Sequence, residues 1–369
     1  MIIQVPDYIR SLVPYVPGKP IEETQREFKI KKVIKMASNE NSLGPSPLAR
    51  RAITKVMKDL HRYPDAGGFI LKKALSEHLG VMPSSLILGN GSNEIIDQLI
   101  RTFCIPGDAI VTHQASFIAY KICAQIHGVE TLEARLDPDL NFDRAELVDM
   151  VKRNSRARLV FLANPNNPTG NYLPIAELKK LIAEISAIRG GAVLFVLDAA
   201  YWEYVTAEDL PDMTSLLKSF PNLVVLRTFS KVYGLAGLRV GYGIASPEII
   251  ANLEKVRQPF NLNSLAMVGA TAALADHSFI KKTLRANQTG MKFWEKKLGQ
   301  MSIPFWKSQG NFLLIDTERG LGKSGLEVYQ ACLRKGVIFR PVANYGLTQA
   351  LRITVGTPEE NLKAVKVLK

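Results

Sequence analysis

Residues 159–201 read LVFLANPNNPTGNYLPIAELKKLIAEISAIRGGAVLFVLDAAY, and this stretch decides the fold. Two short apolar runs, 159–162 and 193–197, have the length and composition of buried β-strands. Between them, apolar residues recur every three or four positions from Ile175 to Ile188, which predicts an amphipathic helix. Because a helix connects two continuously apolar strands, the stretch predicts a parallel β-α-β unit whose sheet is covered on both faces.

The same alternation extends in both directions along the chain. Further β-branched runs lie between residues 45 and 265, at 86–88, 109–112, 223–226 and 240–244. They predict an α/β fold with a mostly parallel central sheet and helices on both faces. From residue 266 the sequence is helix-rich and then offers strand candidates at 312–315, 337–339 and 351–355, which predicts a smaller α+β domain. We therefore expect an N-terminal arm that forms part of the small domain (1–40), a large domain (41–265) and a small domain (266–369).

Composition narrows the class of protein. The three cysteines among 369 residues form no CxxC pair, and the five histidines show no metal-ligand spacing, so we expect neither disulfides nor a metal site. This cysteine usage favours a reducing compartment, and the sequence has neither a secretory signal nor an apolar run long enough to span a membrane. The sequence therefore predicts a soluble, cytoplasmic protein without a membrane partner.

The net charge of +13 attracts anions, and it fits nucleic acid, an acidic membrane surface, phosphorylated metabolites or simply a basic surface. A nucleic-acid-binding protein would need a recognition helix or a basic extension. The nearest candidate, residues 28–32, is short and runs into the next motif. We therefore expect small-molecule partners and no nucleic acid.

Side chains that can act as acids, bases or nucleophiles follow the predicted strands. The carboxyl ends of the strands are the place where α/β sheets bind their ligands. Asn164 follows the first strand, Asp198 and Tyr201 the second, and Ser230 and Lys231 the run at 223–226. A lysine between an apolar strand and a glycine-rich segment is partly desolvated, which lowers the pKa of its amine and suits it to Schiff-base formation. A carboxylate, an amide, a phenol and a lysine together meet the needs of pyridoxal phosphate.

An anion site for the cofactor phosphate is also present. Residues 89–93, which include Ser92 and Asn93, form a glycine-rich turn that opens a predicted helix at 94–100. Ser230 and Arg239 add a hydroxyl and a guanidinium group. The sequence therefore predicts that these four side chains hold the phosphate.

The order of these motifs resembles a known family. NPNNPTG at 164–170, DAAY at 198–201 and SKVYGLAGLRVG at 230–241 are similar to the fold-type I, aspartate-aminotransferase-like pyridoxal phosphate enzymes. Within that group, the segments at 37–45, 62–65, 89–94 and 351–357 most resemble the histidinol-phosphate aminotransferases. The resemblance covers the chain from about Tyr8 to its end. It implies a seven-stranded, mostly parallel central sheet and a homodimer.

The resemblance also implies roles at the cofactor. Lys231 would form the Schiff base and then move the substrate proton, while Asp198 would pair with the pyridine nitrogen. Asn164 and Tyr201 would hydrogen-bond the phenolic oxygen. Phe117 would stack on the ring, and Tyr63 would reach the cofactor phosphate of the neighbouring subunit.

Four residues are implied to bind the substrate: Tyr15, Asn41, Arg340 and Arg352. A guanidinium group fits a carboxylate and a phosphate equally well, so one pocket can accept glutamate and histidinol phosphate in turn. The implied reaction converts L-histidinol phosphate and 2-oxoglutarate to imidazole acetol phosphate and L-glutamate. Two alternatives stay open: an aromatic amino acid aminotransferase, with Trp202 and Phe117 enlarging an apolar pocket, and a threonine-phosphate-type decarboxylase.

Overall fold

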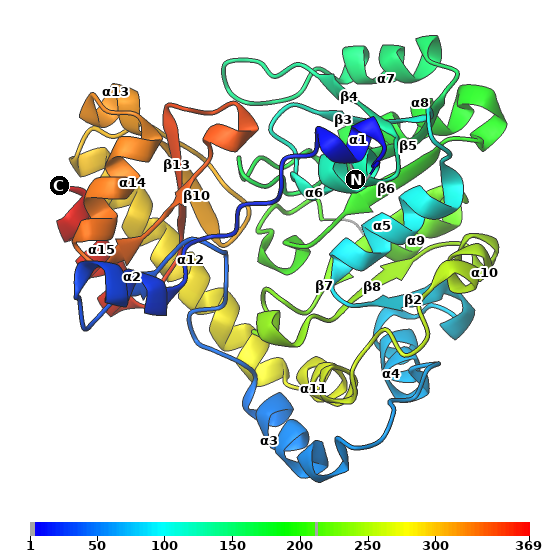
Figure 1. Cartoon of the computed structure of the whole chain (residues 1–369), viewed down its shortest axis with the longest axis horizontal. Helices are drawn as coiled ribbons and strands as arrows, with labels where there is room; N and C mark the ends of the chain where they lie inside the picture. The colour runs from blue at the N-terminus through cyan, green and yellow to red at the C-terminus, as the bar shows by residue number, and fades with distance from the viewer. Residues whose placement is uncertain (1–3, 211–212) are drawn as a thin grey trace.

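The computed structural model describes residues 4–210 and 213–369, which form two packed units (Figure 1). The large unit is built on a seven-stranded sheet with the order β2-β8-β7-β6-β5-β3-β4, in which β8 alone runs antiparallel to its neighbours. Its strands are β2 (Leu86–Gly89), β3 (Ala109–His113), β4 (Glu130–Ala134), β5 (Ala157–Ala163), β6 (Leu194–Asp198), β7 (Leu223–Thr228) and β8 (Gly241–Ile244). The predicted mostly parallel sheet is confirmed.

Successive side chains along the buried strands point to opposite faces of this sheet, and both faces are apolar. In β5, Leu159 and Phe161 pack into one apolar cluster, while Val160 and Leu162 pack into another on the opposite face. The first face is covered by α5 (Ser92–Phe103), α6 (Ala119–Ile126) and α10 (Pro247–Val256). The second is covered by α4 (Phe69–Leu79), α7 (Arg144–Arg153), α8 (Ile175–Ala187), α9 (Met213–Ser219) and α11 (Ser264–Leu274). Helices on both faces are thus confirmed, and α8 is the helix expected between 175 and 188.

Strand β4 was not among the predicted runs. Its sequence, ETLEA, carries two glutamates, and only Ala134 is buried. The strand lies at the edge of the sheet and pairs only with β3. An edge strand is held by backbone pairing more than by apolar burial, so its side chains carry little signal.

The small unit contains a four-stranded antiparallel sheet, in the order β12 (Arg340–Pro341), β13 (Ala350–Thr354), β10 (Phe312–Asp316) and β9 (Phe305–Trp306). A parallel pair joins β1 (Ile34–Lys35) to β11 (Val337–Ile338), so the N-terminal segment is part of this unit's pairing. The helices here are α2 (Ile21–Phe28), α12 (His277–Gln300), α13 (Thr317–Leu321), α14 (Gly325–Arg334) and α15 (Pro358–Leu368). The predicted domain boundaries at 40/41 and 265/266 stay a prediction.

The N-terminal arm connects the two units (Figure 1). Its first helix, α1 (Asp7–Arg10), lies on α6, where the Gln125 side chain donates to the Tyr8 carbonyl at 3.1 Å. The remaining helices are α3 (Pro47–Val56) and six 3₁₀ turns: η1 (Met57–Asp59), η2 (Pro83–Ser85), η3 (Ile188–Gly191), η4 (Trp202–Tyr204), η5 (Ala236–Leu238) and η6 (Ala343–Tyr345). None of the helices in the described ranges has both the length and the apolar character needed to cross a membrane.

Candidate active site

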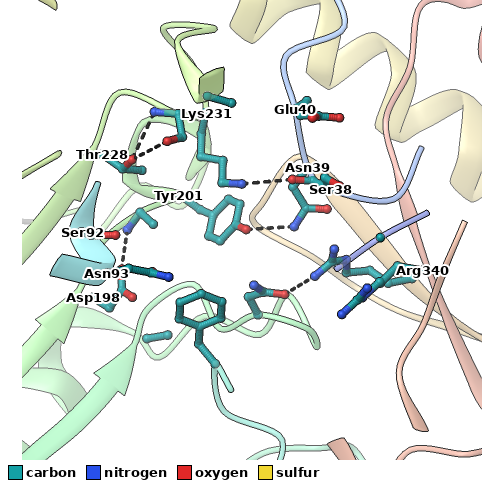
Figure 2. Close-up of a pocket in the computed structure, with 18 of the residues that line it drawn as sticks. Ser38, Asn39, Glu40, Ser92, Asn93, Asp198, Tyr201, Thr228, Lys231 and Arg340 are labelled. Atoms are coloured by element: carbon teal, nitrogen blue, oxygen red, sulfur yellow. Dashed lines mark hydrogen bonds between the residues drawn. The ribbon is translucent and has the colours of Figure 1, made fainter. Parts of the chain in front are cut away.

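A cavity of about 250 Å³ lies at the carboxyl edge of the large sheet and is closed by the small unit and the arm. Because the parallel strands end at this edge, the loops that follow them converge here. Figure 2 shows Lys231 and Tyr201 entering from the large unit, with Ser38, Asn39 and Arg340 opposite them. Of the residues predicted from sequence, the cavity is lined by Tyr15, Ser92, Asn93, Phe117, Asp198, Tyr201, Ser230, Lys231, Arg239, Arg340 and Arg352.

The amine of Lys231 is the central nucleophile of this cavity. Its Nζ donates to the Ser38 carbonyl at 3.1 Å and lies 5.5 Å from the centre of the Tyr201 ring (Figure 2). Burial lowers the pKa of Lys231 to about 7, and the positive charge of Arg352 adds to this shift. At neutral pH a large fraction of the amine is therefore unprotonated and able to attack a carbonyl carbon.

Asp198 supplies the carboxylate. Tyr120 Oη donates to its Oδ2 at 2.8 Å, and the Ala200 backbone N–H donates to its Oδ1 at 3.1 Å. Burial raises the pKa of Asp198, while these two hydrogen bonds act in the opposite direction and favour the anion. The sequence analysis missed Tyr120. This tyrosine lies in the first turn of α6, stacks on Phe161 of β5 at 4.8 Å and so reaches the end of β6, a contact that only the strand order creates.

The predicted anion site is assembled around Ser230. Arg239 Nη1 donates to Ser230 Oγ at 3.3 Å, and Thr228 Oγ1 lies 3.0 Å from the same oxygen. Gly91 precedes α5 at a φ of +77°, and a Cβ there would lie 2.3 Å from Arg239 Nη2, so only glycine leaves room for this guanidinium group. Hydroxyls, a guanidinium group and the free N–H groups at the start of α5 thus form a cradle that fits a phosphate.

Two arginines form the other end of the cavity. Arg340 of β12 pairs in register with Arg352 of β13, and both side chains are buried. Arg352 donates to the side-chain oxygen of Asn167 and to the Ala37 carbonyl, whereas Arg340 donates to the Val16 carbonyl at 3.0 Å. Within the described part of the chain, neither arginine forms an ion pair with a carboxylate. Two adjacent buried cations without an internal counter-ion favour an anionic ligand.

Asn164 does not line the cavity, so its predicted contact with the cofactor stays a prediction. Its amide nitrogen donates to the Leu173 carbonyl at 2.9 Å, and its oxygen accepts from the Leu173 N–H at 2.8 Å, so both ends of the amide are bonded to Leu173. Asn167, three residues later, lines the cavity instead. The stretch NPNNPTG offers an Asn-Pro pair at each end, and the sequence alone does not tell which asparagine turns inward.

Asn41 does not line this cavity either, so its predicted contact with the substrate stays a prediction. Its amide nitrogen donates to the Val232 carbonyl at 2.8 Å, and its oxygen accepts from the Leu43 N–H at 3.0 Å, away from the cavity. Asn39 lies in the cavity and donates to Tyr201 Oη at 2.8 Å (Figure 2). Asn39, Thr228, Asn167 and Tyr345 are cavity residues that were not predicted.

Two aromatic residues singled out from the sequence, Tyr63 and Trp202, do not line the cavity. Tyr63 is 83% exposed, stacks on Phe260 at 4.8 Å and does not line the cavity of its own chain. Trp202 packs in the core of the large unit and is only 6% exposed. The expectation that Trp202 enlarges an apolar substrate pocket is therefore wrong.

Comparison with known proteins agrees with this arrangement. The family model described as "Aminotransferase class I and II" matches residues 31–368. A histidinol-phosphate aminotransferase of Anaeromyxobacter sp. is 44% identical, over 99% of this chain and 98% of the relative. Histidinol-phosphate aminotransferase 2 of Pseudomonas fluorescens is also 44% identical, over 98% and 95% of the two chains.

Solved structures share the whole fold. Histidinol-phosphate aminotransferase from Sinorhizobium meliloti, in complex with pyridoxal-5'-phosphate, superposes with a TM-score of 0.86 at 27% identity, covering 100% of this chain and 98% of the other. Aspartate aminotransferase from Thermus thermophilus with maleate gives a TM-score of 0.84 at 17% identity, covering 99% of each chain. At that identity the second likeness concerns the fold alone.

Proposed function

Because the chain belongs to the class I and II aminotransferases and, within them, to the histidinol-phosphate aminotransferase family, we propose that it transfers the amino group of L-histidinol phosphate to 2-oxoglutarate. The products are imidazole acetol phosphate and L-glutamate. The observation that carries the proposal is the placement of a lysine of lowered pKa in one cavity with a buried carboxylate, a phosphate cradle and two unpaired arginines.

The cofactor of this family is pyridoxal phosphate, and the donor set fits it. Asp198 would hold the pyridine nitrogen, and Phe117 would stack on the ring. Tyr201 and Asn167 would hydrogen-bond the phenolic oxygen. The cradle residues Ser92, Asn93, Thr228, Ser230 and Arg239 would hold the phosphate. When bound, the cofactor withdraws electrons from the substrate carbon that carries the amino group.

Lys231 performs the proton transfers. Its unprotonated Nζ, favoured by burial, is the group that would hold the cofactor by its aldehyde and would accept the proton from the substrate carbon that carries the amino group. Arg352 and Arg340 orient the substrate by its anionic end, phosphate in one half-reaction and carboxylate in the other. Tyr15 lies beside Arg340, 5.8 Å from ring centre to guanidinium carbon, and covers this end of the cavity.

A homodimer is part of this proposal. Tyr63 is exposed and does not line the cavity of its own chain, which leaves it available to the phosphate of a neighbouring subunit. Its surroundings support an interface, because exposed apolar side chains gather along the same segments: Met57, Leu60, Phe69, Ile70 and Phe260. A cytoplasmic location stays a prediction from the cysteine usage.

The test compares substrates on purified holoenzyme. Glutamate formation from histidinol phosphate and 2-oxoglutarate should be much faster than from phenylalanine, and the Lys231→Ala variant should abolish it. Faster turnover of phenylalanine would replace the proposal by the aromatic aminotransferase, and release of carbon dioxide without consumption of 2-oxoglutarate would replace it by the decarboxylase.

A further inference from the structure

Asn39 joins the two sides of the candidate active site through hydrogen bonds at both ends of its side chain. Its amide nitrogen donates to Tyr201 Oη of the large unit at 2.8 Å (Figure 2). Its amide oxygen accepts from Thr354 Oγ1 of β13 at 2.9 Å. Asn39 is only 1% exposed, so bulk water does not compete for these bonds. The residue therefore links the strand that carries Arg352 to a phenol of the cavity.

The backbone at Asn39 fixes the place of this side chain. Its φ is +54°, a left-handed conformation that asparagine tolerates better than most residues other than glycine. Its N–H donates to Thr354 Oγ1 at 3.0 Å, and its carbonyl accepts from the Asn311 side chain at 3.1 Å. Residues held in such sparsely populated conformations are typical of active sites, where the conformation can serve to position a side chain.

The hydroxyl of Thr354 decides which end of the Asn39 amide faces Tyr201. This hydroxyl accepts from the Asn39 N–H and has one proton to donate. Its acceptor, among the residues that the structure describes, is the Asn39 amide oxygen. If the amide were reversed, the buried hydroxyl proton would lose that acceptor, which is unfavourable. The amide oxygen therefore faces Thr354, and the amide NH₂ group faces Tyr201.

This arrangement leaves the proton of Tyr201 available. Because Tyr201 Oη accepts from Asn39, its own proton is not used in that bond, and it finds no acceptor among residues 4–210 and 213–369. The Tyr201 ring packs edge-on against Phe312 of β10, with ring centres 5.1 Å apart, which holds the phenol in place. The proton is therefore left for a ligand in the cavity that Tyr201 lines.

The bond from Asn39 also makes Tyr201 a stronger donor. Burial raises the pKa of Tyr201, while the positive charge of Arg352 and the hydrogen bond from Asn39 lower it. A hydroxyl that accepts one hydrogen bond donates the next one more strongly. The other charged or titratable groups around this phenol are Asp198, Lys231, Tyr120 and Tyr204. A substitution at Asn39 or Thr354 removes none of these groups.

We propose that Asn39, held by Thr354, is a positioning residue that turns the Tyr201 proton toward the phenolic oxygen of the bound cofactor and so lowers the affinity of the cofactor for a proton. A hydrogen bond donated to that oxygen favours its negative charge, so the bound cofactor loses its proton at lower pH. The inference rests on the proposed function for the contact between Tyr201 and the cofactor. It does not depend on the identity of the substrate, and its test is made without substrate.

The test is a pH titration of the visible absorption of the holoenzyme, because the bound cofactor absorbs differently when it is protonated. Thr354→Val keeps the shape of the side chain and removes the hydroxyl, so the midpoint of the absorption change should move to higher pH. Thr354→Ser keeps the hydroxyl and should restore the wild-type midpoint. Thr317→Val, which removes a buried hydroxyl of the small unit outside the cavity, should leave the midpoint unchanged. A wild-type midpoint in Thr354→Val, or equal shifts in the valine and serine variants, would overturn the proposal.

Asn39→Gly and Tyr201→Phe complete the test. Glycine accepts the φ of +54° and keeps both backbone bonds, so Asn39→Gly removes only the side chain. It should raise the proton-binding constant of the bound cofactor by at most about tenfold, the effect of one hydrogen bond, and by less than Tyr201→Phe does. The double variant should titrate like Tyr201→Phe, because Asn39 acts through the Tyr201 hydroxyl. A further shift in the double variant, or no shift in Asn39→Gly or Tyr201→Phe, would overturn the proposal.

Discussion

Removal of a single hydroxyl group, Tyr120→Phe, should weaken the hold of this protein on its cofactor. Tyr120 Oη donates to Asp198 Oδ2 at 2.8 Å in a fully buried setting, whereas the ring contacts with Phe117 and Phe161 survive the substitution. A hydrogen bond to a charged group contributes about 1.5–3 kcal/mol. Its loss would raise the pKa of Asp198 further and, at about 1.5–3 kcal/mol, weaken pairing with a protonated pyridine nitrogen about 10- to 100-fold.

The assay is equilibrium dialysis of the apoprotein against pyridoxal phosphate over a range of pH. Burial already raises the pKa of Asp198, so the carboxylate protonates as the pH falls, and it should do so at higher pH in Tyr120→Phe than in the wild type. The loss of affinity should therefore grow as the solution becomes more acidic. Tyr204→Phe, which removes a buried phenol outside the cavity, serves as control. A dissociation constant within about twofold of wild type at every pH, or a loss that does not change with pH, would refute this reasoning.

Three further predictions concern Lys231, Tyr63 and Arg352. The folded pKa of Lys231 is lowered from 10.5 to about 7, so the folded state binds fewer protons than the unfolded state between these values, and apoprotein stability should rise with pH through this window. Lys231→Met should remove most of this dependence of the unfolding free energy on pH and stabilise the apoprotein at pH 7 by at most about 5 kcal/mol. Urea unfolding measures both effects, and an unchanged pH dependence would contradict the assigned pKa. Mixing Tyr63→Ala with Lys231→Ala should recover roughly a quarter of wild-type activity, because a hybrid dimer contains one intact site, and no recovery argues against the shared site. Arg352→Lys should raise KM for both substrates at least about tenfold, since an ammonium group does not form the bidentate contacts of a guanidinium group, while a fall in kcat alone would place Arg352 outside substrate binding.

Sequence reasoning was accurate where a side chain's place follows from the strand before it. Asp198 is the last residue of β6, and Lys231 lies in the loop just after β7. Parallel strands bring their carboxyl ends to one edge whatever the details of the loops. Sequence reasoning did not predict which way side chains inside the loops point. Asn164 and Asn167 have the same neighbour, proline, yet one is bonded to Leu173 and the other faces the cavity.

The same limit applies to residues far from any strand end. Asn41 and Asn39 lie two positions apart in an irregular segment, and their directions depend on contacts with Val232 and Tyr201, which are distant in sequence. Trp202 follows Tyr201 directly, but the 3₁₀ turn η4 directs it into the core. No local pattern specifies these directions.

The sequence by itself determined the alternation of strand and helix, the parallel sheet and the groups available at its carboxyl edge, because these follow from apolar periodicity and from chain order. The tertiary structure alone decided which polar atoms meet. Tyr120 reaches Asp198 across β5, Arg340 lies opposite Arg352, and Asn39 donates to Tyr201 Oη. Hydrogen bonds act over about 3 Å, so they depend on how distant segments pack, whereas burial of a strand or helix depends mainly on its own composition.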